Sequence, residues 1–95
     1  MANRLLVLYI RENGLLVNRL GISISRKVGK AVLRNRIKRL IKEQIRLNEG
    51  KISPGYDLII VVRAAAGTLP KNVAFKQIGE SLLNLVDRHK IRGVS

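Results

Sequence analysis

The chain has 95 residues, of which 46% are hydrophobic, so it can form one domain with a modest core. Its 19 Lys and Arg against six Asp and Glu give a formal net charge of +13, an excess typical of proteins that bind nucleic acids. It has no cysteine and no apolar run near the roughly 20 residues of a membrane span. This excludes a disulfide framework and a membrane-spanning segment. We expect a single cytoplasmic domain over residues 1–95 whose partner is a polyphosphate.

The first part of the chain predicts strands. The nearly all-apolar run from Arg4 to Arg11 favours a buried strand over a signal peptide, because no small-residue cleavage site follows it. Glu12 to Gly14 carry an Asn-Gly turn signal, and Leu15 to Asn18 could add a further short strand. Leu20 to Ser25 alternates strictly and predicts a half-buried strand. Its second face is small and polar, formed by Gly21, Ser23 and Ser25.

From Ala31 to Leu47 the hydrophobic period changes to that of a helix, and Gly50 is the predicted stop. One arc of this helix carries Leu33, Ile37, Leu40, Ile41 and Gln44, with Ile45 at its edge. A β-branched strand is predicted over Tyr56 to Arg63. A second helix is predicted from Thr68, with Pro70 behind it, to about Lys90. Its inner stripe is Phe75, Ile78, Leu82, Leu85, Val86 and His89.

This order of elements predicts an α+β fold in which a mixed sheet has its helices packed on one face. The strand–helix–strand unit would by default cross over right-handed. Tyr56 and Phe75 are expected in the core. His89, the only histidine, is expected to be structural.

The polar face of the first helix is almost entirely cationic. It carries Asn35, Lys38, Arg39, Lys42 and Arg46, flanked by Arg34 and Arg36. Like charges four residues apart repel each other by about 0.2–0.5 kcal/mol per pair. Lys27 and Lys30 crowd the N-terminal end, where the helix dipole attracts anions. A solvated charged face would alternate Glu with Lys, whereas arginines around a helix N-terminus form a phosphate site. We therefore predict that this face binds nucleic acid.

Asn35 stands between two arginines and has poor helix propensity. It either caps or turns the chain, or it reaches a base edge, a 2′-hydroxyl or a phosphate. The sequence offers no catalytic constellation of its own, because it has one His, no Cys and six scattered carboxylates. A protein-only nuclease would need paired carboxylates for Mg²⁺. We expect no catalytic residue and no metal site on the protein.

The run GISISRKVGKAVLRNRIKRLIKEQIR, from Gly21 to Arg46, resembles the signature of the bacterial ribonuclease P protein component. ANRLLVLYI (Ala2 to Ile10) is similar to the first strand of that family, and YDLIIVVR to its last core strand. The resemblance implies a left-handed crossover around the basic helix, within a fold also found in ribosomal proteins. It also implies the protein subunit of an endoribonuclease that removes the 5′ leader of precursor tRNA.

The resemblance further implies that the RNA subunit is the catalyst and uses Mg²⁺. The expected partners are ribonuclease P RNA and precursor tRNA, with no other protein required. The residues expected to face RNA are Arg26, Lys27, Lys30, Arg34, Asn35, Arg36, Lys38, Arg39, Lys42 and Arg46. Tyr9 matches an aromatic residue lining the leader cleft. Ser23 and Ser25 would leave room there for an RNA strand, although their small face could equally pack a helix.

Family members usually begin with a basic, aromatic helix that forms one wall of the leader cleft. Here Met1 is followed almost directly by the first strand. We therefore expect an incomplete leader groove, and we expect contact with the catalytic RNA to be better preserved than contact with the leader.

Three other classes of protein compete with this interpretation. A structural rRNA-binding protein of similar fold would share the charge but not the Arg-Asn-Arg run. A DNA-binding regulator would place a second helix at turn spacing before the basic one, and none is predicted. A membrane-surface helix would carry Trp or Phe on its apolar side, and this helix does not.

Overall fold

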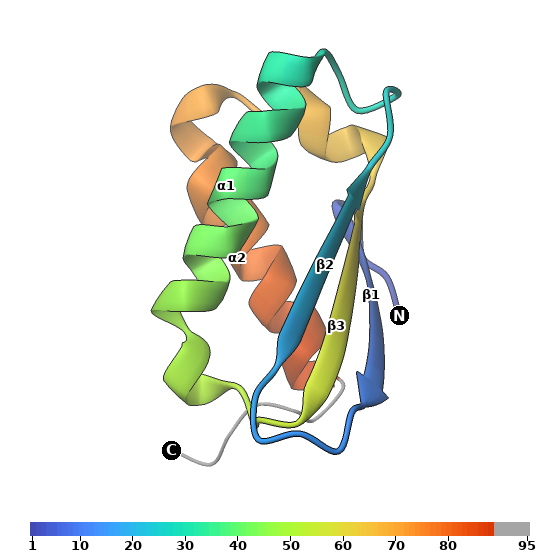
Figure 1. Ribbon diagram of the computed structural model, residues 1–95. Coiled ribbons are helices and arrows are strands. Elements are labelled where there is room, and N and C mark those ends of the chain that lie inside the picture. Colours follow the sequence, from blue (N-terminus) through green and yellow to red (C-terminus); the bar gives the residue numbers. More distant parts are fainter. Residues whose placement is uncertain (89–95) are drawn as a thin grey trace.

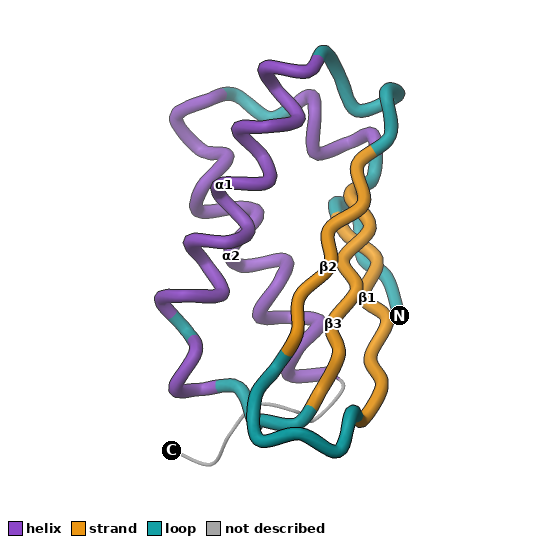
Figure 2. The backbone as a smooth tube through the Cα atoms, in the orientation of Figure 1, coloured by secondary structure: helices purple, strands orange, loops and turns teal. Residues whose placement is uncertain are grey.

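The computed structural model of the protein describes residues 1–88. Strands β1 (Leu6–Glu12), β2 (Arg19–Ile24) and β3 (Tyr56–Val62) form one sheet in the order β1-β3-β2. β3 lies in the middle, antiparallel to β1 and parallel to β2. Helix α1 (Ala31–Leu47) joins the two parallel strands, and α2 (Lys71–Arg88) follows β3. Both helices cover the same face of the sheet (Figures 1 and 2). This confirms the predicted α+β fold.

Alternation along the strands gives the sheet one covered and one open face. Leu6 and Leu8 of β1 are buried beneath the helices, whereas the alternate residues Val7 and Tyr9 point the other way. β3 repeats this pattern, with its buried positions at Leu58, Ile60 and Val62. In β2 the alternate residues Leu20, Ile22 and Ile24 pack against the core, as predicted.

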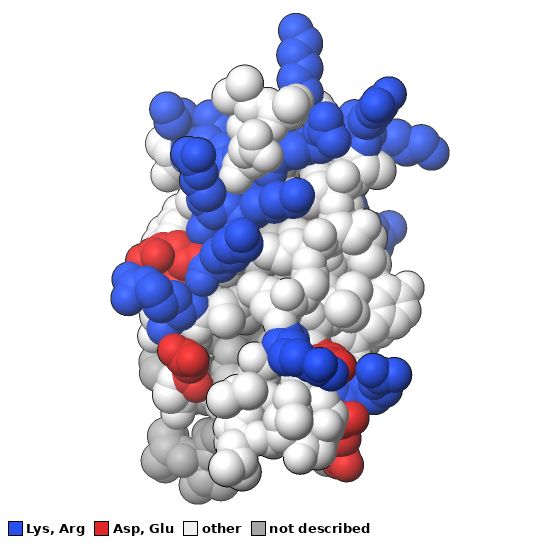
Figure 3. Space-filling view, viewed as in Figure 1, with Lys and Arg blue, Asp and Glu red and all other residues white. Residues whose placement is uncertain are grey.

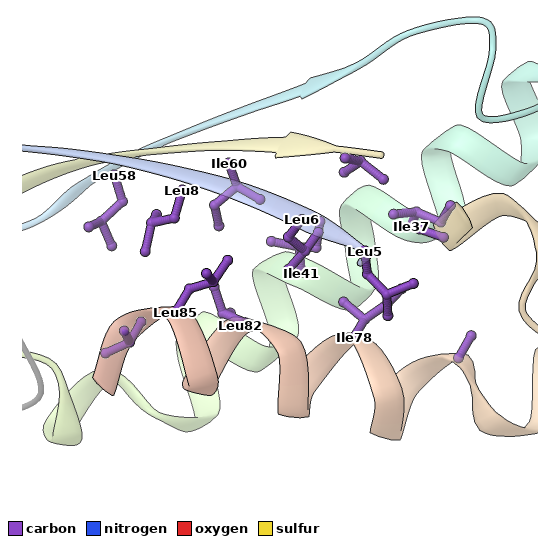
Figure 4. Packing of buried hydrophobic residues seen from close by; sticks show 14 of the residues in the cluster. Leu5, Leu6, Leu8, Ile37, Ile41, Leu58, Ile60, Ile78, Leu82 and Leu85 are labelled. Carbon is purple, nitrogen blue, oxygen red and sulfur yellow. The ribbon is translucent and has the colours of Figure 1, made fainter. Parts of the chain in front are cut away.

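The core lies between the sheet and the two helices (Figure 4). β1 and β3 supply one side of it, α1 contributes Ile37 and Ile41, and α2 contributes most of the rest. The fully buried α2 side chains are Ile78, Leu82, Leu85 and Val86. Full burial of an aliphatic side chain of this size is worth about 1.5–3 kcal/mol, so this layer fixes the orientation of α1.

The prediction of a further short strand over Leu15 to Asn18 is wrong, because this segment forms bends and Leu16 is 92% exposed. Asn13 explains the difference. Its side-chain oxygen accepts the Leu15 N–H (2.8 Å), and its amide donates to the Val17 carbonyl (3.1 Å). These local bonds satisfy backbone groups that a strand would have used. The predicted Asn-Gly turn is present, with Gly14 at a φ of 70°.

α1 runs from Ala31 to Leu47, as its periodicity predicted, but it ends three residues before Gly50, the predicted stop. Asn48 ends it, because its backbone leaves the helical conformation (φ −111°, ψ 12°) and its side-chain amide caps the Gln44 carbonyl at 2.8 Å. A short 3₁₀ turn, η1 (Glu49–Lys51), follows. A second one, η2 (Ala64–Thr68), leads from β3 toward α2.

α2 begins at Lys71 rather than Thr68, whose hydroxyl donates to the Ala65 carbonyl inside η2 (2.7 Å). The expected core position of Phe75 is wrong, because this side chain is 40% exposed. It lies near the start of α2, where the buried neighbours are Ala74 and Ile78. Tyr56 is partly buried against the core, as expected. The prediction for His89 lies outside the described residues.

Candidate RNA interface

The basic face of α1 is turned away from the core. Ile37, Ile41 and Gln44 are its buried residues, which fixes the opposite side of the helix toward solvent. That side carries Asn35, Arg39 and Lys42, all exposed. Arg36 and Lys38 are partly exposed beside them. In the space-filling view, Lys and Arg gather over α1 and the turn before it, and acids lie mostly at the other end (Figure 3).

The N-terminal end of α1 lacks the groups that usually complete it. Lys30 occupies the N-cap position and makes no side-chain cap hydrogen bond, and the first turn contains no acid. A helix start leaves four backbone N–H groups without helical partners, and together with the helix dipole they favour an anion. Here Arg26, Lys27 and Lys30 surround that end, and all three are exposed. The arrangement has the chemistry of a phosphate site.

Most of the residues predicted to face RNA make no side-chain hydrogen bond or ion pair within residues 1–88. Arg46 is the exception. Its guanidinium donates to both carboxylate oxygens of Glu43, at 3.1 and 2.5 Å. Because of these hydrogen bonds the pKa of Glu43 is lowered. Arg46 is thus partly neutralised by its own helix, and the uncompensated cations lie nearer the N-terminal end.

Arg34 differs from its neighbours because its side chain is only partly exposed and its Nε is buried. This Nε has no hydrogen-bond partner within the described residues. A buried donor without a partner costs roughly 1–3 kcal/mol relative to a satisfied one.

The open face of the sheet carries a second group of predicted residues. Tyr9 pairs with Ile59 in the register of β1 and β3, and Gly21 of β2 lies on the other side of Ile59. Tyr9 and Ile59 are 58% and 44% exposed. The next row on the same face includes Ser23, which is exposed beside Val61. A shallow groove of about 340 Å³ runs past Tyr9 and Ile59, so an apolar, partly aromatic surface is accessible here.

Ser25, the third residue predicted for this face, lies past the last residue of β2. It is exposed, and its carbonyl accepts the Val28 N–H (3.1 Å) at the start of the turn before α1. The structure therefore places Tyr9 and Ser23 on one surface. Ser25 instead lies where the sheet passes into the turn of residues 25–30 before α1, which carries Arg26, Lys27 and Lys30 and is called the basic turn below.

One charged row on the open face was missed by the sequence analysis. Asp57 of β3 lies between Arg11 and Arg19 in the register. Arg19 donates to both of its oxygens, at 2.7 and 2.9 Å, and Arg11 and Asn13 each donate once. The hydrogen bonds from Arg19, then Asn13, hold the pKa of Asp57 well below its usual range. Only the strand register, which the sequence did not give, could have identified this row.

Within residues 1–88, no group of three or more His, Cys, Asp or Glu side chains is arranged to hold a metal ion. In the same part of the chain, neither helix is both long and apolar enough to cross a membrane.

The comparisons with known proteins agree with one another. A family model described as Ribonuclease P matches residues 1–90. The ribonuclease P protein component of Clostridioides difficile (strain 630) is 50% identical over 91 residues, which are 95% of this chain and 76% of the relative. That of Alkaliphilus metalliredigens is 44% identical over 91 residues, covering 96% and 78% of the two chains.

Solved structures show the same fold. The ribonuclease P protein of Thermotoga maritima superposes with a TM-score of 0.85 at 39% identity, over 93% of this chain and 80% of that one. The Staphylococcus aureus protein gives a TM-score of 0.85 at 36% identity, over 98% and 82%. Matches of this extent, found independently in sequence and structure, establish that the chain belongs to the bacterial ribonuclease P protein component family.

Proposed function

We propose that this chain is the protein subunit of a cytoplasmic ribonuclease P. It binds the catalytic RNA and precursor tRNA and assists Mg²⁺-dependent removal of the 5′ leader. Membership of the family implies a part in an endoribonuclease complex that processes tRNA. The single observation that carries the RNA-binding part is the cationic face of α1. Its side chains from Arg34 to Lys42 have no acidic partner within the described residues, so a polyphosphate can neutralise them.

In this proposal the catalytic RNA lies along α1 and its N-terminal end. Arg26, Lys27, Lys30, Arg34, Arg36, Lys38, Arg39 and Lys42 contact phosphates, and Arg46 does so only when it leaves its ion pair with Glu43. Asn35 offers both a donor and an acceptor to a base edge or 2′-hydroxyl. Arg34 is partly exposed and has no acidic partner within the described residues, which supports a phosphate contact by its guanidinium.

The 5′ leader lies on the open face of the sheet in the same proposal. Tyr9 and Ile59 offer an exposed surface on which an unpaired base can stack, and the small residues Gly21 and Ser23 leave room for the strand. Ser25 lies at the end of this path, next to the basic turn.

Mg²⁺ is assigned to the RNA subunit. The described residues of the protein do not fit the ion, because they bring together no cluster of carboxylates and their surface near α1 is cationic. No step of the reaction is therefore assigned to a metal held by the protein. Its own residues bind and orient the two RNAs.

The direct test is cleavage of a precursor tRNA by a bacterial ribonuclease P RNA at low Mg²⁺, with and without this chain. Stimulation is the expected result. Tight binding to that RNA without stimulation would limit the function to RNA binding. If the chain neither binds that RNA nor stimulates cleavage, the proposal is refuted and a structural rRNA-binding role is favoured.

Arg36→Ala tests the face of α1, and Arg4→Ala is its matched control. Arg4 is exposed and lies beside α2 in a groove that no residue of α1 lines. Arg36→Ala should weaken binding to the catalytic RNA and leave the melting temperature nearly unchanged, whereas Arg4→Ala should change neither. A large fall in melting temperature for Arg36→Ala would show that Arg36 is structural.

A further inference from the structure

The turn from Ser25 to Lys30 has exposed cations and one buried residue, Val28, which anchors the turn to the core. Arg26 and Lys27 are exposed, but Val28 between them and α1 is only 5% exposed. Two backbone hydrogen bonds close the turn: Val28 N–H to Ser25 O (3.1 Å) and Gly29 N–H to Arg26 O (3.2 Å). The position of Val28 therefore decides where Arg26 and Lys27 stand relative to α1.

Gly67, in η2, lies directly against this anchor. A Cβ on Gly67 would overlap the carbonyl oxygen of Val28, and it would stand 2.9 Å from the carbonyl carbon and 3.3 Å from Cγ1. The first two of these atoms are backbone, so no change of rotamer can relieve the overlap. At Gly79, in contrast, an added Cβ would meet the side chain of Gln44. The contact between η2 and the turn thus requires the absence of a side chain at position 67.

The need for glycine at position 67 comes from this contact and not from its backbone conformation. Among the described glycines, only Gly14, Gly29 and Gly55 have positive φ angles. Alanine can therefore adopt the backbone conformation of Gly67 without strain. η2 cannot easily retreat, because Ala66 is buried in the core and its N–H is bonded to Arg63 O (3.0 Å). A side chain at position 67 would push the turn outward.

We propose that Gly67 is a positioning residue for RNA binding. Although far from α1 in sequence, it lets the turn settle against η2 and thereby holds Arg26 and Lys27 beside the N-terminal end of α1. This inference rests on the proposed function, in which that end contacts the catalytic RNA. A displaced turn would keep every cation of the chain but would separate these two from the cations on the helix.

The test compares Gly67→Ala with Gly50→Ala in the full chain. A Cβ on Gly50 would meet nothing within 4 Å, and its φ is not positive, so it is a matched control. Binding to ribonuclease P RNA is measured as a function of salt, and folding is checked by circular dichroism. The log–log slope of affinity against salt is negative, and each lost phosphate contact makes it shallower by about 0.7–0.9. Loss of the contacts of Arg26 and Lys27 would therefore make it shallower by roughly 1.4–1.8. A purely structural role would lower the melting temperature and leave the slope of the folded protein unchanged.

Val28→Ala tests the same contact at its other residue, because it removes part of the buried side chain that anchors the turn and adds no atoms. It decides the question if Gly67→Ala does not fold. We expect a shallower slope for Gly67→Ala and Val28→Ala, and the wild-type slope for Gly50→Ala. Folded Gly67→Ala or Val28→Ala protein with the wild-type slope would refute the positioning role. A wild-type slope near −1 would instead refute the extended RNA surface, and with it the proposed function.

Discussion

The ion pair between Glu43 and Arg46 sets the limit of the cationic face of α1, and Glu43→Gln tests this limit. The substitution removes the carboxylate that accepts two hydrogen bonds from Arg46 and leaves Arg46 free to reach a phosphate. One additional phosphate contact steepens the log–log salt slope of RNA binding by about 0.7–0.9. For a fourfold increase in salt, this corresponds to an extra loss of roughly threefold in affinity. At low salt the variant should bind ribonuclease P RNA more tightly than wild type.

Glu12→Gln is the charge-matched control. Glu12 is exposed at the end of β1, and its loss raises the net charge by the same single unit. Binding is measured by titration of labelled RNA at several salt concentrations. If the two variants change the slope equally, net charge and not location governs binding. If Glu43→Gln leaves both slope and affinity unchanged, Arg46 lies outside the interface and the cationic face ends before it.

Three further predictions concern the fold. Ile41→Ala should lower the free energy of unfolding by about 2–5 kcal/mol in urea, because Ile41 is fully buried in α1. An effect below about 1 kcal/mol would contradict the packing described. Phe75→Ala should lower the free energy of unfolding clearly less than Leu82→Ala in the same assay, since Phe75 is 40% exposed. Equal losses would show that Phe75 is a core residue. The pKa of Asp57 is lowered in the folded state, so its carboxylate contributes stability above about pH 4 that is lost as the pH falls further. Asp57→Asn should flatten this acid limb of the unfolding midpoint, and an unchanged limb would show that other groups cause it.

The sequence predicted best what depends on local periodicity. The bounds of α1 followed directly from the spacing of Leu33, Ile37 and Ile41, because a helix buries one arc of its surface whatever the partner is. The same logic failed for Phe75. The angular position of a residue identifies its face of the helix, but it does not say how far along that face the rest of the protein covers the helix. The covered length depends on packing between segments distant in sequence.

The interface was predictable where it consists of one helix and not where strands assemble it. The cations from Arg34 to Lys42 share a face because they share a helix. The row of Arg11, Asp57 and Arg19 exists only because β3 lies between β1 and β2, and strand order is a property of the whole fold. The contact of Gly67 with Val28 is of the same kind, since nothing in the sequence brings η2 against the turn.

The common direction of the two helices affects how the protein meets its partner. α1 and α2 both begin at the end of the molecule where the basic turn lies, and β1 ends at the opposite end with Glu12 (Figure 1). Each helix adds about half a positive charge to that end. A body with this charge separation experiences a torque near a polyanion, so it rotates its basic end forward while still a Debye length, about 10 Å at 0.1 M salt, from the RNA. A larger fraction of collisions is then productive at low salt, and orientation is selected before the first hydrogen bond forms.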